Sequence, residues 1–523
     1  MKRRSFLQQT LQGVTLPALV GGFSVKAFGE ASPFFDMFGL AEDTDHVLVL
    51  VQLNGGNDGL NTVIPLDQYS LYNNARSNIA IPESKVLSLT NNKATGLHTA
   101  MTGMQSLYND GKMAIVQAVG YPSPNFSHFR ATDIWMSASD SNQFVNSGWA
   151  GRYLNQYYPN YPSGYPNSNM PDPVAIQIGS VTSLALQGPA VNMGMSITNP
   201  SSFYNLVNGV QDTAPNTPAG KELTYIRTVA RQTQQYADTI KTAAAKVVQQ
   251  SAYPTGNSLA DQLKIVARLV KGGLKTRVYM VSMGGFDNHA NQVNNTDKTT
   301  GTHANLLKTL SDAVKAFQDD LKFLGVEDRV LGMTFSEFGR RIKSNGSVGT
   351  DHGAAAPVFL FGKNVQPGVV GTNPIIPANP TVQDNVAFQY DFRSVYASIL
   401  ESWFCVDNTT IQGLLLKNFQ RLPVVNGAGC GITPPAASVG KIRNYPNPFE
   451  SQTTIEFTSN GGHTLLQVID MTGRVIAVLL DKEYTGPTTD RVVFQGGTLP
   501  AGSYYARLQN GTDTKVCLMM KLR

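Results

Sequence analysis

Histidine and carboxylate side chains recur next to short apolar runs of this chain. Four runs, over residues 46–53, 112–119, 277–283 and 329–335, are each followed by such side chains, and a fifth, over 357–361, is preceded by them. In chain order these residues are Asp58, Ser127, His128, Asp287, His289, Glu337, Asp351 and His352. Carboxylate oxygens and imidazole nitrogens together suit a divalent ion such as Zn²⁺, Mn²⁺, Mg²⁺ or Ca²⁺ that acts as a Lewis acid. No cysteine accompanies them, which excludes a thiolate or iron-sulfur site.

The apolar runs predict strands that are buried on both faces. Amphipathic stretches over residues 258–271, 304–323 and 392–403 predict helices that cover those strands. The predicted fold class is therefore α/β, a layered domain with a mostly parallel central sheet over residues 46–420. Ligands of such sheets collect at the carboxyl ends of the strands, so we expect these side chains to share one site.

The N-terminus predicts a signal peptide over residues 1–27. Arg3 and Arg4 precede a mildly apolar stretch, and Ala27 is the last residue of the predicted cleavage site. The arginine pair resembles a twin-arginine export signal, with a general secretory signal as the alternative. The apolar stretch is shorter than the ~20 residues of a membrane-spanning helix, so we expect no transmembrane segment in the mature form.

Charge and cysteine content exclude several classes of protein. The net charge of +5 includes four cations that precede the predicted cleavage point, and their removal leaves about +1. With no basic run elsewhere, we expect no nucleic-acid partner. Three widely spaced cysteines exclude a dense disulfide framework, although a single bridge between Cys405 and Cys430 is compatible with export.

The last part of the chain differs from the central domain in composition and in its hydrophobic pattern. A linker rich in Gly, Pro and Ala over residues 424–440 precedes alternating runs over 441–523 that predict a small antiparallel β-sandwich of the immunoglobulin-like kind. Segments of this tail strongly resemble the C-terminal sorting domain of type IX secretion: Tyr445-Pro446-Asn447-Pro448-Phe449, Asp470-Met471-Thr472-Gly473-Arg474 and Leu499-Pro500-Ala501-Gly502-Ser503-Tyr504-Tyr505. The resemblance implies export and type IX secretion machinery as partners, with transit through the periplasm to the outer cell surface or the medium. A carbohydrate-binding sandwich is the alternative.

Seven motifs of the central domain occur in the order of a known family. They are Gly55-Gly56-Asn57-Asp58-Gly59-Leu60-Asn61-Thr62, Gly120-Tyr121-Pro122, Ser127-His128-Phe129, Gly148-Trp149-Ala150-Gly151-Arg152, Gly284-Gly285-Phe286-Asp287, Ser336-Glu337-Phe338-Gly339-Arg340-Arg341 and Thr350-Asp351-His352-Gly353. They resemble the sulfatase-like domain of unknown function 1501, which is itself similar to the alkaline phosphatase, sulfatase and phosphoglycerate mutase superfamily. The resemblance implies an alkaline-phosphatase-like fold.

The resemblance also implies roles for individual residues. The superfamily's first-strand metal ligand corresponds to Asp58, its middle pair to Asp287 and His289, and its late histidine to His352, with Asp351 as a further ligand or as the group that orients the imidazole. Glu337 takes the place of an Asp that the superfamily follows with a His. Here Phe338 follows it. One expected nitrogen ligand is therefore missing, and the number of ions stays open.

Catalysis is assigned to Ser127 and His128. Ser127 matches the superfamily nucleophile at a helix start, although a serine there can equally be only the helix cap. Arg130 and Arg340 are the candidates for binding a substrate anion, because guanidinium groups match phosphate and sulfate geometry. The alternative for such arginines, and above all for Arg341, is a structural ion pair.

The expected function is that of an exported, metal-dependent hydrolase acting on a small-molecule or glycan phosphoester. Phosphate is favoured over sulfate because the chain lacks the Cys-x-Pro-Ser-Arg segment that sulfatases convert to formylglycine. The alternative is a surface binding or structural protein that keeps the scaffold without turnover. The pairing of Glu337 with Phe338 favours that alternative.

Overall fold

A computed structural model describes residues 44–199, 235–430 and 442–522, apart from turn positions 446, 448, 460, 471–473, 487 and 511–512. Two further short strands are described near the N-terminus, β1 (Ala18–Val20) and β2 (Phe23–Val25). The rest of the predicted signal peptide at residues 1–27, and residues 431–440 of the predicted linker, lie outside the described residues. The chain divides into two compact units, Met1–Ile432 and Thr433–Arg523.

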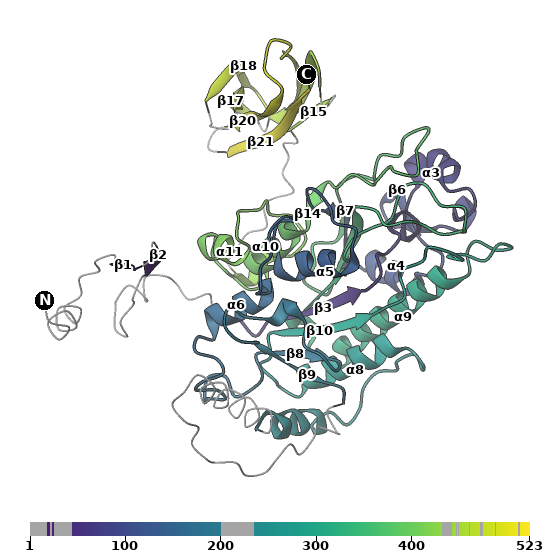
Figure 1. The fold of residues 1–523 in the computed structure, drawn as a ribbon, viewed down its shortest axis with the longest axis vertical. Helices are drawn as coiled ribbons and strands as arrows, with labels where there is room; N and C mark the ends of the chain where they lie inside the picture. The colour runs from purple at the N-terminus through teal and green to yellow at the C-terminus, as the bar shows by residue number, and fades with distance from the viewer. Residues whose placement is uncertain are drawn as a thin grey trace, which may run out of the picture. The chain divides into compact units, whose positions relative to one another are not determined.

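The first unit is built on a nine-stranded sheet whose order is β13-β7-β12-β11-β3-β10-β8-β9, with β14 paired to β7 (Figure 1). Six of its strand pairs are parallel, and only β12 runs antiparallel to its neighbours β7 and β11. The strands are β3 (Val47–Leu53), β7 (Met113–Gly120), β8 (Ala175–Ile178), β9 (Gly194–Ile197), β10 (Val278–Met283), β11 (Val330–Phe335), β12 (Ala356–Phe361), β13 (Gly368–Val370) and β14 (Tyr390–Asp391).

Helices cover both faces of this sheet, as alternate residues of β3 show. Val49 and Val51 belong to one apolar core with residues of α4, α8 and α9, whereas Leu48 and Leu50 belong to another with residues of α5, α6, α10 and α11 (Figure 1). Successive side chains of a strand point to opposite faces, so every residue of β3 is buried. These helices are α4 (Thr102–Asn109), α5 (His128–Ser137), α6 (Trp149–Tyr157), α8 (Ser258–Lys271), α9 (Thr302–Phe323), α10 (Phe392–Ser402) and α11 (Asn408–Leu414).

A smaller antiparallel sheet accompanies two short helices in the segment after β3. Its strands are β4 (Val63–Pro65), β5 (Leu87–Leu89) and β6 (Asn92–Leu97), in the order β4-β6-β5, and the helices are α2 (Gly59–Thr62) and α3 (Tyr69–Ala75). A third apolar cluster, which includes Leu60, Ile64 and Tyr72, holds this segment on the first unit. A disulfide joins Cys405 to Cys430, so the bridge that the sequence left open is formed.

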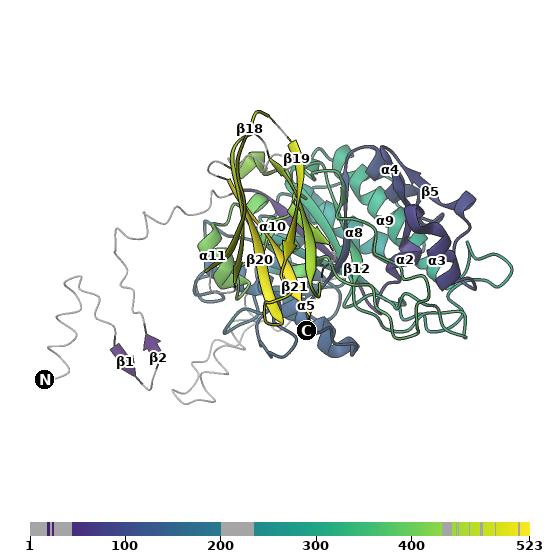
Figure 2. The same cartoon turned by 90° about the horizontal axis from the view of Figure 1, so that it is seen from above.

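The second unit is an all-β sandwich in which every named strand pair is antiparallel (Figure 2). Its two sheets have the orders β15-β16-β19 and β18-β17-β20-β21 and enclose a core that includes Phe457, Leu466 and Val468. The strands are β15 (Ile442–Tyr445), β16 (Gln452–Ser459), β17 (Gly462–Asp470), β18 (Val475–Tyr484), β19 (Thr488–Gln495), β20 (Gly502–Asn510) and β21 (Asp513–Lys521). The predicted fold class is thus confirmed for both units. Within the described residues, no helix has the length and apolar character needed to cross a membrane.

Candidate metal centre

The topology of the sheet brings the chemically active loops to one edge. Strands β3, β7, β10 and β11 run in one direction, so their carboxyl ends meet there, and β12 runs the other way, so its first residue lies at the same edge. The approach of the loops requires glycine: Gly55 has a φ of +120°, and a Cβ atom at this position would lie 2.4 Å from the backbone nitrogen of Asp287. The loops after β3 and β10 are therefore in direct backbone contact.

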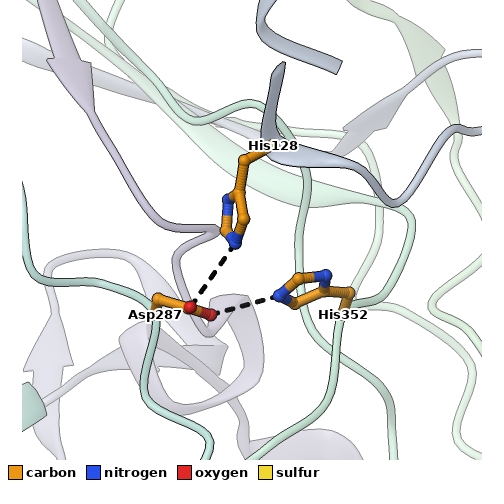
Figure 3. Close-up of side chains that lie close together, drawn as sticks. All are labelled: His128, Asp287 and His352. Carbon is orange, nitrogen blue, oxygen red and sulfur yellow. Dashed lines mark hydrogen bonds and ion pairs between the residues drawn. The ribbon is translucent and has the colours of Figure 1, made fainter. Parts of the chain in front are cut away.

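His128 is the first residue of α5 and points its imidazole across the edge of the sheet (Figure 3). Its Nδ1 lies 2.8 Å from Oε1 of Glu337, and its Nε2 lies 3.5 Å from Oδ2 of Asp287. Glu337 is buried, and the same Oε1 accepts a hydrogen bond of 2.8 Å from the backbone N–H of Gly55. Glu337 was predicted as a metal ligand, but the structure places it behind His128, where it orients the ring.

His352 and His289 present the same arrangement. Nδ1 of His352 lies 2.8 Å from the carbonyl oxygen of Phe126, and Nδ1 of His289 lies 3.2 Å from Oδ1 of Asp351. Their Nε2 atoms lie 3.1 Å and 3.0 Å from Oδ1 of Asp287. Asp351, the alternative ligand or orienting group of the sequence analysis, takes the orienting position.

Each of these rings has acceptor oxygens on both sides, because carbonyl or carboxylate oxygens face Nδ1 and the Asp287 oxygens face Nε2. A neutral imidazole carries one hydrogen, so with that hydrogen on the anchored Nδ1 the Nε2 lone pair is left facing the carboxylate. Nε2 of His289 and Nε2 of His352 nevertheless lie only 2.9 Å apart. Two lone pairs at that distance repel unless a cation or a proton lies between them. The donors present therefore fit a metal ion.

Asp287 is the carboxylate on which the imidazoles converge (Figure 3). One ligand atom each from His128, Asp287 and His352 can be chosen so that all lie within 4.8 Å of one another. The side chain of Asp287 is 47% exposed, and Nη2 of Arg340 donates to its Oδ1 at 2.8 Å. Burial raises the pKa of Asp287, but the hydrogen bond and charge of Arg340, together with the contact to His352, outweigh it and bring the pKa to about 2. The carboxylate is thus ionised and partly open to solvent.

Asp58 is placed differently from Asp287. It is 2% exposed, and both carboxylate oxygens accept from Nη1 of Arg76, at 2.9 and 2.8 Å. Gln292 donates to Oδ2 at 2.6 Å. Burial raises the pKa of Asp58, but the charge of Arg76 and these hydrogen bonds hold the pKa below its ordinary value. The predicted ligand Asp58 is therefore already bound to a cation, and the three-residue group that converges on Asp287 does not include it.

Two further histidines lie behind the loop after β3. His303 is buried with its Nε2 3.0 Å from Oδ1 of Asn57, and its ring makes an edge contact with that of His98. Burial lowers the pKa of His303 to about 4 and that of His98 to about 3, so both are neutral at physiological pH.

The two arginines predicted to bind a substrate anion have protein partners instead. Arg340 is 1% exposed and donates to the carbonyl oxygens of Gly55, Gly56, Phe286 and Thr350 as well as to Asp287. Arg130 donates to carbonyl oxygens of residues 140, 141 and 143 and stacks over the ring of Phe144. Here the structure differs from the prediction, because loop carbonyls within reach are the local partners of both guanidinium groups, of which only that of Arg340 is buried.

Ser127 is exposed and directly precedes α5. Its hydroxyl makes no capping hydrogen bond, although its φ and ψ of −84° and 125° are those of an N-cap residue. Its neighbours on both sides belong to the cluster: the carbonyl of Phe126 holds His352, and His128 is a member itself. The hydroxyl is therefore free of the capping role that was the alternative to nucleophile.

Several contributors to this edge were not predicted. Arg76 and Gln292 have no motif that reveals them, because their partner Asp58 is distant in sequence and meets them only in the folded chain. The ring of Phe338 packs against those of His128 and His352, with centroids 4.9 and 4.5 Å apart. His128 was expected to act in catalysis rather than as a ligand. Its position after the second central strand was the available signal.

The fold and site define a class of protein: an exported α/β domain that carries a histidine-carboxylate cluster at the carboxyl edge of its sheet. Residues 45–401 match the family described as Protein of unknown function (DUF1501), and the chain belongs to that family, as its seven motifs predicted. Residues 443–520 match the Secretion system C-terminal sorting domain. The chain is thus exported to the cell surface or secreted by the type IX route. The twin-arginine type of signal stays a prediction.

Solved structures with similar folds have low sequence identity to this chain. They include the PsFucS1 sulfatase from Pseudoalteromonas sp., which is 11% identical with a TM-score of 0.33 over 88% of this chain and 85% of that one. A protein from a glycosaminoglycan-metabolism locus of Bacteroides thetaiotaomicron is 10% identical with a TM-score of 0.34 over 86% and 90% of the two chains. Likenesses this low carry no information about substrate or reaction. Among curated proteins, none matches this chain.

Proposed function

We propose that this exported protein is a metal-dependent hydrolase of phosphate esters, with sulfate esters as the less favoured substrates. The observation that carries the proposal is the convergence of three imidazole Nε2 atoms on the Asp287 carboxylate, each ring being anchored through Nδ1. His128, His352 and Asp287 would hold the ion, and the Nε2 of His289 is close enough to complete the set. A donor set this rich in nitrogen favours Zn²⁺ over Mg²⁺ or Ca²⁺.

When bound, the ion supplies Lewis-acid polarisation of the ester and a lowered pKa for a coordinated hydroxyl or water. The residues of the chain then have separate tasks. Glu337, Asp351 and the Phe126 carbonyl fix the three rings in the tautomer that binds a metal. Ser127 offers an exposed hydroxyl, which makes no helix-capping hydrogen bond, as nucleophile. The N–H groups at the start of α5 stabilise the negative charge that develops beside it.

A surface binding protein without turnover is the second candidate function, and a specific observation favours it. The arginines expected to clamp a substrate anion, Arg340 and Arg130, donate to the protein's own carbonyl groups. A centre that lacks an anion clamp can hold a metal, and through it a ligand, without accelerating ester cleavage.

The test compares the full chain with three variants. Elemental analysis is combined with assays of a phosphomonoester, a phosphodiester and a sulfate ester. The proposal expects bound metal and hydrolysis in the wild type, loss of both in Asp287→Asn and His352→Gln, and loss of hydrolysis alone in Ser127→Ala.

The matched control is His463→Gln in the sorting domain. Its imidazole also pairs with an aspartate, Asp481, at 2.7 Å, but in an exposed pair of the second unit. This variant is expected to keep metal and activity. Metal bound by the wild type with no cleavage of any of the three esters would favour the binding protein, and full activity of Ser127→Ala would remove that residue as nucleophile.

A further inference from the structure

The number of metal ions that this edge can hold depends on the partner of Asp58 and on the side chains that follow β11. Asp58 is the carboxylate that the superfamily would offer to an ion, and it follows β3 just as Asp287 follows the neighbouring strand β10. Whether a second ion can bind beside the first depends on what Asp58 contacts in this chain.

Arg76 gives Asp58 a permanent cation. The guanidinium is fully buried, and besides both oxygens of Asp58 it donates to the Asn61 side chain and to the carbonyl oxygens of Ile342 and Arg341. Donors on all three of its nitrogens are used in this way, so the group is locked in place and cannot swing aside for an ion. A divalent cation next to Asp58 would meet a fixed positive charge in a region that water does not screen.

Phe338 closes the space between the cluster and the loop after β3. Its ring is 1% exposed and lies against both His128 and His352, while a Cβ atom added at Gly56 would meet that ring at 2.3 Å. A phenyl ring offers no lone pair to a metal. Phe338, which follows Glu337, therefore places an apolar side chain where the ligands of a second ion would be needed.

The remaining carboxylate on this side is also occupied. Oε1 of Glu337 receives the Gly55 N–H and faces His128 Nδ1, and Oε2 accepts from Ser336 Oγ at 3.2 Å. Arg340 adds a second buried guanidinium, which donates to the carbonyls of the loop after β3 and to Oδ1 of Asp287, so that Oδ2 of Asp287 is the oxygen left for the single ion. A second ion beside Asp58 would thus be surrounded by two fixed cations, by a carboxylate whose oxygens are already hydrogen-bonded and by an apolar ring.

From this arrangement we infer that the centre takes one divalent ion, held by His128, His352 and Asp287, and that Arg76 permanently fills the cation position beside Asp58. The inference rests on the proposed function, since it concerns the same centre, but it is independent of turnover. It also narrows the chemistry. A single ion can stabilise either the attacking or the leaving oxygen, whereas a two-metal site clamps both. The other oxygen must then be served by protein groups or by a substrate with a good leaving group.

The test is the stoichiometry of Zn²⁺ on the metal-free full chain, titrated to saturation, separated by gel filtration and measured by elemental analysis. One ion per chain is expected. Asp58→Asn is expected to keep that value with an affinity changed no more than a few-fold, because Asp58 is not a ligand. Asp287→Asn is expected to bind far more weakly. Two ions in the wild type, falling to one in Asp58→Asn, would overturn the inference.

Asp58→Asn alters a buried ion pair and can fail to fold, so a second measurement uses the wild type alone. The electron paramagnetic resonance spectrum of the Mn²⁺-loaded chain is expected to be that of an isolated ion, and the exchange-coupled spectrum of a close pair would contradict it. The outcomes separate the two proposals. One ion without hydrolysis keeps this inference and overturns the hydrolase, two ions with hydrolysis do the reverse, and no bound ion overturns both.

Discussion

Asp58 and Asp287 are two aspartates at the ends of neighbouring parallel strands, and the fold treats them in opposite ways. Asp58 is buried against Arg76, with both oxygens bonded to one guanidinium nitrogen. Asp287 is half exposed, and three imidazoles face it. The comparison shows that position at the sheet edge does not decide whether a carboxylate is free to bind a metal. The two differ in how many oxygens a guanidinium occupies: Arg76 contacts both oxygens of Asp58, whereas Arg340 donates only to Oδ1 of Asp287 and leaves Oδ2 facing His128.

The largest effect is expected on the buried side. Replacing Arg76 by Met leaves the Asp58 charge buried without a partner, which should cost about 3 to 5 kcal/mol of unfolding free energy. This loss of unfolding free energy is measured by urea unfolding of the full chain, monitored with a spectroscopic probe in the first unit. The double variant Asp58→Asn with Arg76→Met should recover a large part of the loss. Equal unfolding free energies of Arg76→Met and wild type would show that the ion pair of Arg76 with Asp58 does not stabilise the fold.

On the exposed side, the effect should fall on metal binding and not on folding. Asp287→Asn is expected to weaken Zn²⁺ binding by more than about 100-fold, beyond the loss typical of an outer partner. Its unfolding free energy should stay close to that of the wild type without metal, since the side chain is 47% exposed. Equilibrium dialysis and urea unfolding separate the two quantities. The matched control is Asp312→Asn, whose partly exposed carboxylate pairs with Lys308 on α9.

Glu337 tests the connection between the two sides, because it is buried but acts on the exposed cluster through His128. Glu337→Gln keeps the size of the side chain and removes its charge, so metal affinity should fall by about 10- to 100-fold. Competition with a chromophoric chelator measures the affinity. The control Glu401→Gln, at a partly exposed carboxylate that pairs with Arg421, should leave the metal affinity unchanged. An unaltered affinity in Glu337→Gln would mean that His128 is oriented without it.

The smallest effect is expected from pH, through the buried histidines. The pKa of His303 in the folded chain is about 4, below the ordinary 6.5, so its contribution to stability is complete above pH 6.5 and is lost as the pH falls towards 4. At about pH 5 the loss should amount to about 2 kcal/mol for this residue. Urea unfolding at about pH 7.5 and pH 5 measures it. His303→Gln should flatten the pH dependence, and an unchanged slope in this variant would exclude His303 as its source.

Much of the first unit could be predicted from sequence because its signals are local. A run such as residues 46–53 has too few polar side chains to face water on either side, so it had to become a strand covered on both faces. The same runs marked the edge where His128, Asp287, His289 and His352 gather. The alternation of the tail, with a Gly or Asn after each run, likewise predicts the antiparallel sandwich that the structure shows.

Only the tertiary structure decided which of those residues face one another. Arg76 reaches Asp58, and Glu337 reaches His128, through contacts between segments that no local pattern connects. The inward turn of Arg340 depends on loop carbonyls that become available only when the loops after β3 and β10 come together. Residue types and strand ends can be recognised in the sequence, and they predicted both the location of the site at the carboxyl edge of the sheet and its histidine-carboxylate composition. The partner of each charge depends on burial and distance in three dimensions, and these contacts separate the candidate metal ligands from the residues that hold them in place.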